Sequence, residues 1–188
     1  MKNNVFENIR CVSVYCGSKT PADPAYDDAA RELARILVEH GIGLVYGGSG
    51  IGTMKVLADA MLKAGGNVTG VFTQSLKDEY LHTGLTETVI AGSLAERKSK
   101  MIERGDALIA LPGGFGTLDE LFDAVARRKM HKGGHRKPIG LLNLNGYYDA
   151  LLAFLAHARE VGYIAKEDAD LIKSAPSPCE LLKMLASD

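Results

Sequence analysis

Residues 111–120, LPGGFGTLDE, place a glycine-rich turn directly before a carboxylate. The turn holds Gly113, Gly114 and Gly116, after a hydrophobic run and before a helical pattern. A glycine turn at a helix N-terminus exposes backbone N–H groups beside the partial positive charge of the helix, and this suits a phosphate group. A tight strand-to-helix turn also needs glycine, so one such turn alone supports a phosphate site only weakly.

The carboxylate that follows, Glu120, has two interpretations. Thr117 and Glu120 have capping-box spacing, in which Thr117 caps the helix and Glu120 reaches back to the Thr117 N–H. Alternatively, an ionised Glu120 acts as a general base or stabilises positive charge, a role that glutamine cannot fill. The residues alone leave both open. Ser93 and Glu96 have the same spacing, and for them capping is favoured.

Two basic residues share a helix face with apolar ones. Leu94, Arg97, Lys98 and Met101 stand at positions i, i+3, i+4 and i+7. Long basic side chains can extend past apolar neighbours into solvent. A stripe directed at an anionic ligand explains the placement better, so Arg97 and Lys98 are candidate ligand-binding residues.

The elements that would position these residues alternate between strand and helix. Apolar strands are expected at 11–16, 43–48, 67–72, 106–112 and 137–143, with a further strand at 86–90. Helices are expected at 24–41, 53–66, 93–105, 117–130 and 146–162, with shorter ones near 166–173 and 178–186. This alternation predicts an α/β fold: a Rossmann-like, doubly wound parallel sheet in three α/β/α layers, forming a single domain over 1–188.

Three of the expected strands end in glycine or small polar residues. The segments are CGSKTPAD (16–23), YGGSGIGTM (46–54) and PGGFGT (112–117). In a doubly wound sheet the carboxyl ends of the strands meet at one edge, where the ligand crevice lies. None of the three fits GxGxxG or a Walker loop. The pattern therefore favours a mononucleotide without a metal-bound triphosphate.

The composition is that of an ordinary globular domain. The net charge of −1 gives no sign of nucleic-acid or membrane binding, and no apolar run reaches the roughly 20 residues of a membrane helix. The N-terminal segment lacks the apolar core of a secretory signal. Cys11, Cys16 and Cys179 are expected to be buried, reduced thiols. We expect a cytoplasmic protein with no metal site.

The segment 127–137, RRKMHKGGHRK, is strongly basic. Such a run is typical of a solvated loop, which is the favoured interpretation. It would also suit an anionic substrate or acidic residues of a second subunit. His131 and His135 lie four residues apart within it, but glycine and lysine around them argue against the helix that a metal site would need.

Two segments together resemble a known family. PGGFGTLDE (112–120) matches the PGGxGTxxE signature of the LOG ("Lonely guy") family, and ERKSKM (96–101) matches its ERKxxM element. The resemblance extends over most of the chain, from VYCGS to VGYI. It implies a Rossmann-like homodimer that hydrolyses the N-glycosidic bond of AMP or N6-substituted AMP, a cytokinin riboside 5′-monophosphate. The products are free base and ribose 5-phosphate, and no metal or organic cofactor is implied.

The resemblance also assigns roles to individual residues. Arg97 and Glu120 match the family's catalytic pair. The remaining matches are substrate-binding positions: a phosphate and ribose cradle, and further nucleotide contacts. They are Gly113, Gly114, Gly116 and Thr117 for the cradle, and Ser18, Gly48, Met54 and Lys98 for the contacts.

The sequence departs from the family pattern where the base and a neighbouring subunit would be contacted. Ser49 and Lys55 replace glycines, Ala95 replaces the histidine that often precedes ERK, and the chain has no tryptophan. A non-catalytic nucleotide-binding protein, of the kind of the molybdenum-cofactor carriers, is the alternative. A pyridoxal-phosphate decarboxylase is a third, with Lys98 as its plausible Schiff-base lysine.

Overall fold

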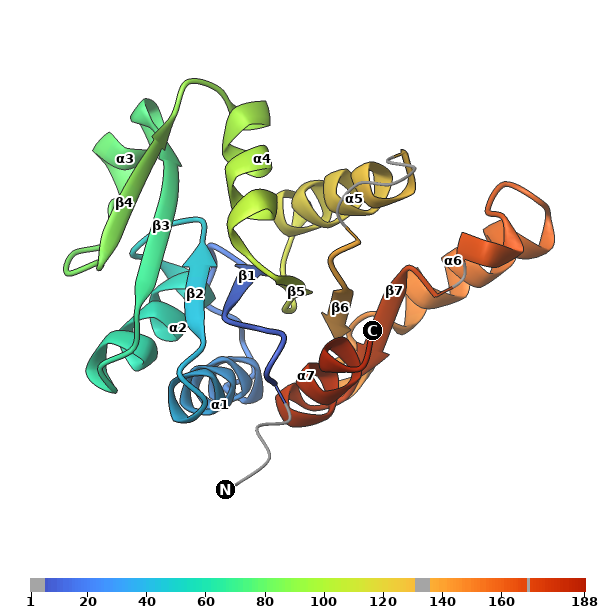
Figure 1. Ribbon diagram of the computed structural model, residues 1–188, viewed down its shortest axis with the longest axis horizontal. Helices are drawn as coiled ribbons and strands as arrows, with labels where there is room; N and C mark the ends of the chain where they lie inside the picture. The colour runs from blue at the N-terminus through green and yellow to red at the C-terminus, as the bar shows by residue number, and fades with distance from the viewer. Residues whose placement is uncertain (1–5, 131–135, 169) are drawn as a thin grey trace.

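The computed structural model describes residues 6–130, 136–168 and 170–188. Within them, seven strands form one parallel sheet in the order β4-β3-β2-β1-β5-β6-β7 (Figure 1). The strands are β1 Cys11–Tyr15, β2 Gly43–Tyr46, β3 Val68–Thr73, β4 Glu87–Ala91, β5 Ala107–Ala110, β6 Ile139–Leu142 and β7 Ile172–Ala175. The strand order reverses between β1 and β5, which confirms a doubly wound sheet and puts its switch point there.

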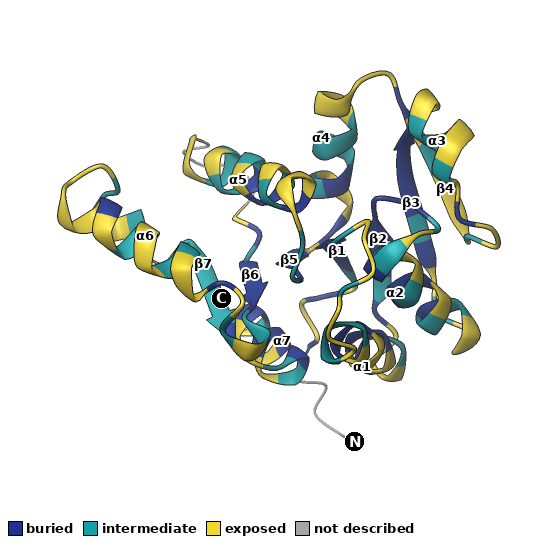
Figure 2. Cartoon of the chain, turned by 180° about the vertical axis from the view of Figure 1, so that it is seen from behind, coloured by how far each residue is buried: buried dark blue, intermediate teal, exposed yellow. Residues whose placement is uncertain are grey.

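Helices cover both faces of the sheet, as the sequence predicts. They are α1 Ala25–Glu39, α2 Gly52–Lys63, α3 Gln74–Tyr80, α4 Leu94–Arg104, α5 Phe115–Met130, α6 Asp149–Glu160 and α7 Pro178–Ala186, with short 3-10 helices η1 Leu144–Gly146 and η2 Lys166–Asp168. One apolar core lies between the sheet and α1, α2 and α7, and a second between the sheet and α4, α5 and α6. Figure 2 shows the central strands buried between these layers.

The strands and helices form for the reasons that their sequence patterns indicate. Ala30, Leu33, Ala34 and Leu37 of α1 recur at helical spacing, and all are almost fully buried. The helix α1 ends just before Gly41, which has a positive φ of 69°. Burial of such a stripe, at about 1.5–3 kcal/mol for each large side chain, holds a helix on the sheet.

The helix α4 is fixed at both ends. At its start the Ser93 hydroxyl accepts a hydrogen bond from the Glu96 N–H at 3.1 Å, which confirms the predicted cap. At its end the Ser13 hydroxyl of β1 donates to the Met101 carbonyl oxygen at 2.5 Å. The buried Lys137 ammonium donates to the carbonyl oxygens of residues 102 and 103, both at 2.6 Å. The Ser13 hydroxyl and the Lys137 ammonium thus satisfy carbonyl groups that the end of a helix leaves without intrahelical partners.

The solvated-loop interpretation of 127–137 is wrong for residues 127–130, which form the end of α5. Arg128 pairs with Asp188 at 2.9 Å, and Lys129 with Asp168 at 2.6 Å. These acidic partners come from distant parts of the sequence, so the basic run gives no sign of them. The expectations for His131 and His135 fall outside the described residues.

Two predictions of secondary structure are also wrong or incomplete. The helix expected near 166–173 is instead the short η2 followed by β7, an edge strand of only four residues. Its half-buried side chains give no clear strand alternation. The helix α3 was not expected, because residues 74–80 are short, polar and lack any buried stripe.

Gly48, at the end of β2, must be glycine to allow close packing. Its φ is +81°, and a Cβ atom there would lie 2.1 Å from Cζ of the fully buried Phe72 ring. Gly41 has a similar positive φ of 69°, but a Cβ atom there would meet no atom within 4 Å. Comparing substitutions at the two glycines therefore separates the cost of backbone strain from the cost of overpacking.

We predict that Gly48→Ala lowers the free energy of unfolding much more than Gly41→Ala. Backbone strain should cost about 1–2 kcal/mol at either position. Overpacking against Phe72 should add about 1–3 kcal/mol at residue 48 alone. Urea unfolding of the two variants measures both, and equal losses would contradict the packing explanation.

Candidate active site

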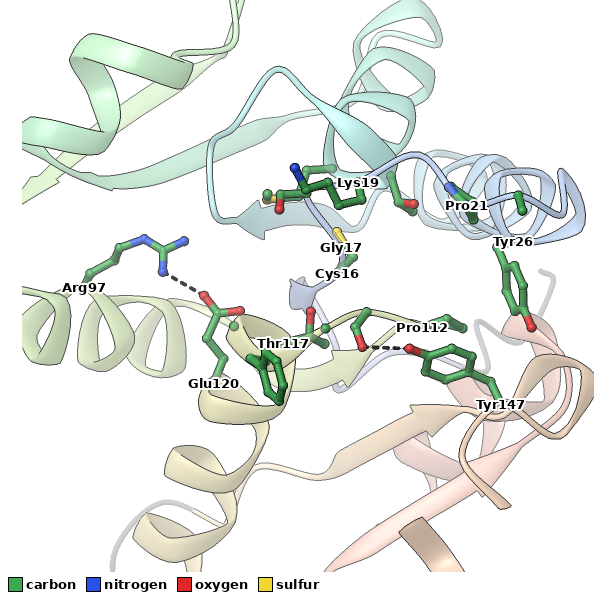
Figure 3. Close-up of a pocket in the computed structure, with 18 residues that line it drawn as sticks. Cys16, Gly17, Lys19, Pro21, Tyr26, Arg97, Pro112, Thr117, Glu120 and Tyr147 are labelled. Atoms are coloured by element: carbon green, nitrogen blue, oxygen red, sulfur yellow. Dashed lines mark hydrogen bonds and ion pairs between the residues drawn. The ribbon is translucent and has the colours of Figure 1, made fainter. Parts of the chain in front are cut away.

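A cavity of about 600 Å³ opens at the switch point of the sheet. It is bounded by the turn after β1 and by the glycine turn 113–116 after β5 (Figure 3). The carboxyl ends of two diverging strands leave this crevice open because the helices that follow them cover opposite faces. The edge that the sequence predicts is thus the edge that holds the cavity.

Arg97, on α4, is held from three sides at this cavity. Its Nη1 donates to Glu120 Oε1 at 2.7 Å, its Nε to the Val71 carbonyl oxygen at 2.8 Å, and its Nη2 to the Gly47 carbonyl oxygen at 3.4 Å. A Cβ atom at Gly47 would lie 2.5 Å from Nη2, so glycine there gives the guanidinium its place. Figure 3 shows Arg97 and Glu120 pointing toward one another.

The Arg97–Glu120 pair is almost withdrawn from solvent. The two side chains are only 11% and 12% exposed. Burial raises the pKa of the Glu120 carboxyl above its ordinary value, and the Arg97 guanidinium opposes that rise. A carboxylate with a raised pKa, held by a charged donor, is a better proton acceptor than an ordinary glutamate.

Cys16 lines the same cavity but is no candidate nucleophile. Burial raises the pKa of its thiol, and the nearby Glu120 carboxylate raises it further. A thiol in this state stays protonated, whereas nucleophilic cysteines need a lowered pKa. Cys16 therefore serves as an apolar part of the cavity floor.

The capping interpretation of Glu120 is wrong. The helix α5 begins at Phe115, two residues earlier than expected, and the Leu118 N–H already donates to the Gly114 carbonyl oxygen at 3.1 Å. Thr117 is therefore inside the helix, and Glu120 bonds to Arg97. Glycines 114 and 116 let the helix start within the turn, where a sequence pattern indicates only a loop.

The glycines of the 113–116 turn have different reasons to be glycine. A Cβ atom at Gly113 would lie 2.2 Å from Thr117 Oγ1, so that position is fixed by packing. Gly114 and Gly116 have no positive φ, and a Cβ atom at either would meet nothing within 4 Å. Neither packing nor backbone strain explains them. Both positions leave open space beside the first N–H groups of α5.

Tyr147 fixes the orientation of this turn. Its hydroxyl donates to the Gly113 carbonyl oxygen at 2.8 Å, as Figure 3 shows. In a trans peptide the next N–H points away from that carbonyl, so the bond also orients the Gly114 N–H. Tyr147 stacks edge-on against Tyr26 and Tyr148, which keeps its ring in place.

The cavity brings together most of the residues singled out from the sequence. They are Ser18, Met54, Arg97, Gly113, Gly114, Gly116, Thr117 and Glu120. Gly48 and Lys98 do not line it. Gly48 packs on Phe72, and Lys98 Nζ lies 2.9 Å from a carboxylate oxygen of Asp119 on α5. Lys98 thus pairs with a neighbouring helix, which the stripe on α4 does not reveal.

Sequence reasoning missed three side chains of the cavity wall: Lys19, Tyr26 and Tyr147. Lys19 follows β1 in a segment whose small polar residues had marked it as a ligand edge. The two tyrosines come from α1 and the turn after η1, and no spacing in the sequence connects them to the glycine turn.

A second chamber of about 220 Å³ adjoins the main cavity. It shares Ser18, Lys19, Met54 and Arg97 with the main cavity. Its remaining wall is mostly apolar and aromatic, formed by Gly47, Ser49, Ile51, Phe72, Leu76 and Tyr80. Arg97 thus lines both the main cavity, with its glycine turn and Glu120, and a largely apolar second chamber.

Comparison with known proteins identifies the family. The family described as possible lysine decarboxylase matches residues 54–185. The cytokinin riboside 5′-monophosphate phosphoribohydrolase LOG5 of Arabidopsis thaliana is 42% identical over 93% of this chain and 76% of its own length. The chain belongs to the LOG family. The rice enzyme LOG is also 42% identical, over 94% of this chain and 72% of its own length.

Solved structures with the same fold are more distant from this LOG-family chain in sequence. A molybdenum cofactor binding protein of Rippkaea orientalis superposes with a TM-score of 0.70 at 23% identity, covering 94% of this chain and 95% of its own. The molybdenum cofactor carrier protein of Chlamydomonas reinhardtii gives 0.71 at 20% identity, covering 95% and 98%. At such identities the likeness shows a common fold.

Two searches of the described residues are negative. None of their helices is long and apolar enough to cross a membrane. Among the same residues, no group of three or more histidine, cysteine, aspartate or glutamate side chains is arranged to hold a metal ion.

We predict that Arg97→Met raises the pKa of Glu120 further, because the guanidinium is the main group that opposes the effect of burial. Lys98→Met is the matched control, since Lys98 contributes least among the groups that act on Glu120. Carbon-13 NMR titration of the Glu120 carboxyl measures both. Equal effects of the two substitutions would contradict the assignment of Arg97 as its charge partner.

Proposed function

We propose that this LOG-family chain hydrolyses the N-glycosidic bond of AMP or of an N6-substituted AMP, a cytokinin riboside 5′-monophosphate. The products are the free base and ribose 5-phosphate. The observation that carries the proposal is the 2.7 Å contact between Arg97 and a buried Glu120, directly beside the glycine turn 113–116. The names of the relatives at 42% identity support the same reaction.

The glycine turn is proposed to bind the 5′-phosphate. The open backbone at Gly114 and Gly116 admits phosphate oxygens to the free N–H groups at the start of α5. Thr117 adds a hydroxyl, and Lys19 adds a cation at the cavity wall. Because the phosphate is bound at one end of the nucleotide, its binding energy orients the sugar toward Glu120.

Glu120 is proposed to act at the anomeric carbon of the sugar. Breaking the C1′–N bond builds positive charge on the ribose, which a carboxylate stabilises. The raised pKa of Glu120 also suits it to accept a proton from the attacking water. The water oxygen then bonds to C1′, the bonding pair leaves with the base, and a proton reaches the base. Arg97 keeps the carboxylate ionised and directed at the sugar.

The base is proposed to extend toward the second chamber. The glycine turn and Glu120 line the main cavity, and the second chamber adjoins it at Arg97, so the phosphate, the sugar and the base can each be given a place. Phe72, Leu76 and Tyr80 offer the apolar and aromatic surface that a purine and an N6 substituent would contact.

The alternative functions have less support. The likeness to the molybdenum-cofactor proteins, at 23% identity or below, supports a shared fold rather than a shared ligand. For a pyridoxal-phosphate decarboxylase, Lys98 does not fit the Schiff-base role, because it is ion-paired with Asp119 away from the cavity.

We predict that Glu120→Gln keeps the fold and still binds AMP, but lowers turnover by about 100-fold or more, because it removes the ionised carboxylate. Asp119→Asn is the matched control: it removes an adjacent carboxylate that is 66% exposed and should retain most activity. Release of free base from AMP, N6-isopentenyl-AMP, GMP and CMP is followed by chromatography.

Two outcomes would overturn this proposal. Full activity of Glu120→Gln would remove the carboxylate from the mechanism. Tight nucleotide binding by the wild-type protein, with no free base from any of the four substrates, would favour a non-catalytic nucleotide-binding protein.

The working form is proposed to be a cytoplasmic homodimer. Leu94 of α4 is 61% exposed and Phe115 of α5 is 94% exposed, and each precedes a member of the Arg97–Glu120 pair on the same helix. Apolar side chains so exposed beside a ligand cavity favour cover by a second subunit. The free thiols of the three cysteines suit a reducing compartment.

We predict that analytical ultracentrifugation of the wild-type protein gives twice the mass of one chain. The double substitution Leu94→Glu and Phe115→Glu should shift the measured mass toward that of one chain, because it would bury charges at the interface. Met184→Glu, at a comparably apolar exposed position on α7, should leave the mass unchanged. A single-chain mass for the wild-type protein would contradict the homodimer.

A further inference from the structure

The loop 47–52, which borders the second chamber, is held in place by residues 80–82. The Gly50 N–H donates to the Tyr80 carbonyl oxygen at 2.8 Å, and the His82 N–H donates to the Gly48 carbonyl oxygen at 3.1 Å. Ser49 and Leu81 form an isolated antiparallel bridge between them. The position of the loop therefore depends on how firmly His82 itself is anchored.

The His82 ring is anchored by two acceptors. The residue is only 6% exposed. Its Nδ1 lies 2.6 Å from the Thr83 carbonyl oxygen, and its Nε2 lies 3.1 Å from Asp59 Oδ1 on α2. A carbonyl oxygen can only accept, and so can an ionised carboxylate. The Lys55 ammonium holds the pKa of Asp59 below its usual value, so Asp59 is ionised.

Both bonds can therefore exist only when His82 is an imidazolium, with a proton on each ring nitrogen. A neutral ring protonated at Nδ1 would turn the lone pair of Nε2 toward the Asp59 carboxylate. A neutral ring protonated at Nε2 would instead oppose the Thr83 carbonyl oxygen. Either way, proton loss replaces one hydrogen bond by a contact between two acceptors.

The charged groups nearest His82 come from α2: Asp59 contacts the ring, and Lys55 pairs with Asp59. Tyr46 of β2 also lies near Asp59, because that carboxylate raises the Tyr46 pKa after the larger effects of burial and Cys16. Among these, only Asp59 forms an ion pair with the ring. Histidine is the side chain whose charge ordinarily changes across the physiological range.

We propose that His82 is a positioning residue for the reaction proposed above: as an imidazolium between Asp59 and the Thr83 carbonyl oxygen, it fixes the 47–52 loop for catalysis. The link to the active site is direct, because the Gly47 carbonyl oxygen accepts from Arg97 Nη2 and Met54, just after the loop, lines the cavity. Loss of the His82 proton loosens the loop, and with it one of the three contacts that orient Arg97. Activity should therefore be lower when the ring is neutral.

The substitution Asp59→Asn tests this claim. An asparagine amide can donate to Nε2, so a neutral His82 protonated at Nδ1 would keep both bonds. Between pH 6 and 9 we expect kcat/KM of the wild-type protein to fall about tenfold, the fold-change that corresponds to one charged hydrogen bond. Asp59→Asn should remove that fall. His157→Gln, in an exposed histidine of α6, should leave the wild-type profile unchanged.

Nitrogen-15 NMR of the His82 ring gives a second measurement that needs no activity. At pH 6 we expect the two ring nitrogens to have the similar chemical shifts of an imidazolium. A neutral ring at pH 6, or an Asp59→Asn profile that falls like the wild-type one, would overturn the role of His82. If the wild-type protein cleaves no nucleotide at any pH, the proposed function fails, and the NMR result still decides the charge of His82.

Discussion

The site depends above all on the bonds that the Arg97 guanidinium makes. They join α4 to the end of β2, to β3 and to α5, and one of them is the ion pair with Glu120. Removing one partner of a nearly buried ion pair leaves a charge uncompensated, at a cost of about 3–5 kcal/mol. The rest of the fold works to keep Arg97 there: Ser13 and Lys137 fix the end of α4, and Gly47 leaves space for the guanidinium.

The fold was predictable where the pattern was strong and local. The doubly wound sheet was predicted from buried strands, amphipathic helices and the glycine that ends a helix at Gly41. Such a sheet places its ligand crevice at the carboxyl ends of the strands. Prediction failed at the short, half-buried β7 and at the polar helix α3, whose placement depends on the sheet edge rather than on their own residues. Tertiary context decides such elements.

The site was predictable where a residue type has one chemical use. The glycines at the start of α5 predicted an anion site, and the family resemblance paired Arg97 with Glu120, which the structure brings into contact. Lys98 was misjudged because its partner, Asp119, lies on another helix. The hydrogen bond from Tyr147 to the glycine turn and the His82–Asp59 pair were missed for the same reason, since each joins segments that are distant in sequence. One position, Gly48, has glycine for packing rather than for a ligand.

The most direct test is a crystal structure of Glu120→Gln with AMP bound. The account predicts the phosphate against the backbone N–H groups of residues 114–117, the C1′ atom beside residue 120, and the base directed toward Phe72 and Leu76. A phosphate bound elsewhere, or a sugar turned away from residue 120, would contradict the assignment of the Arg97–Glu120 pair as the site of glycosidic cleavage.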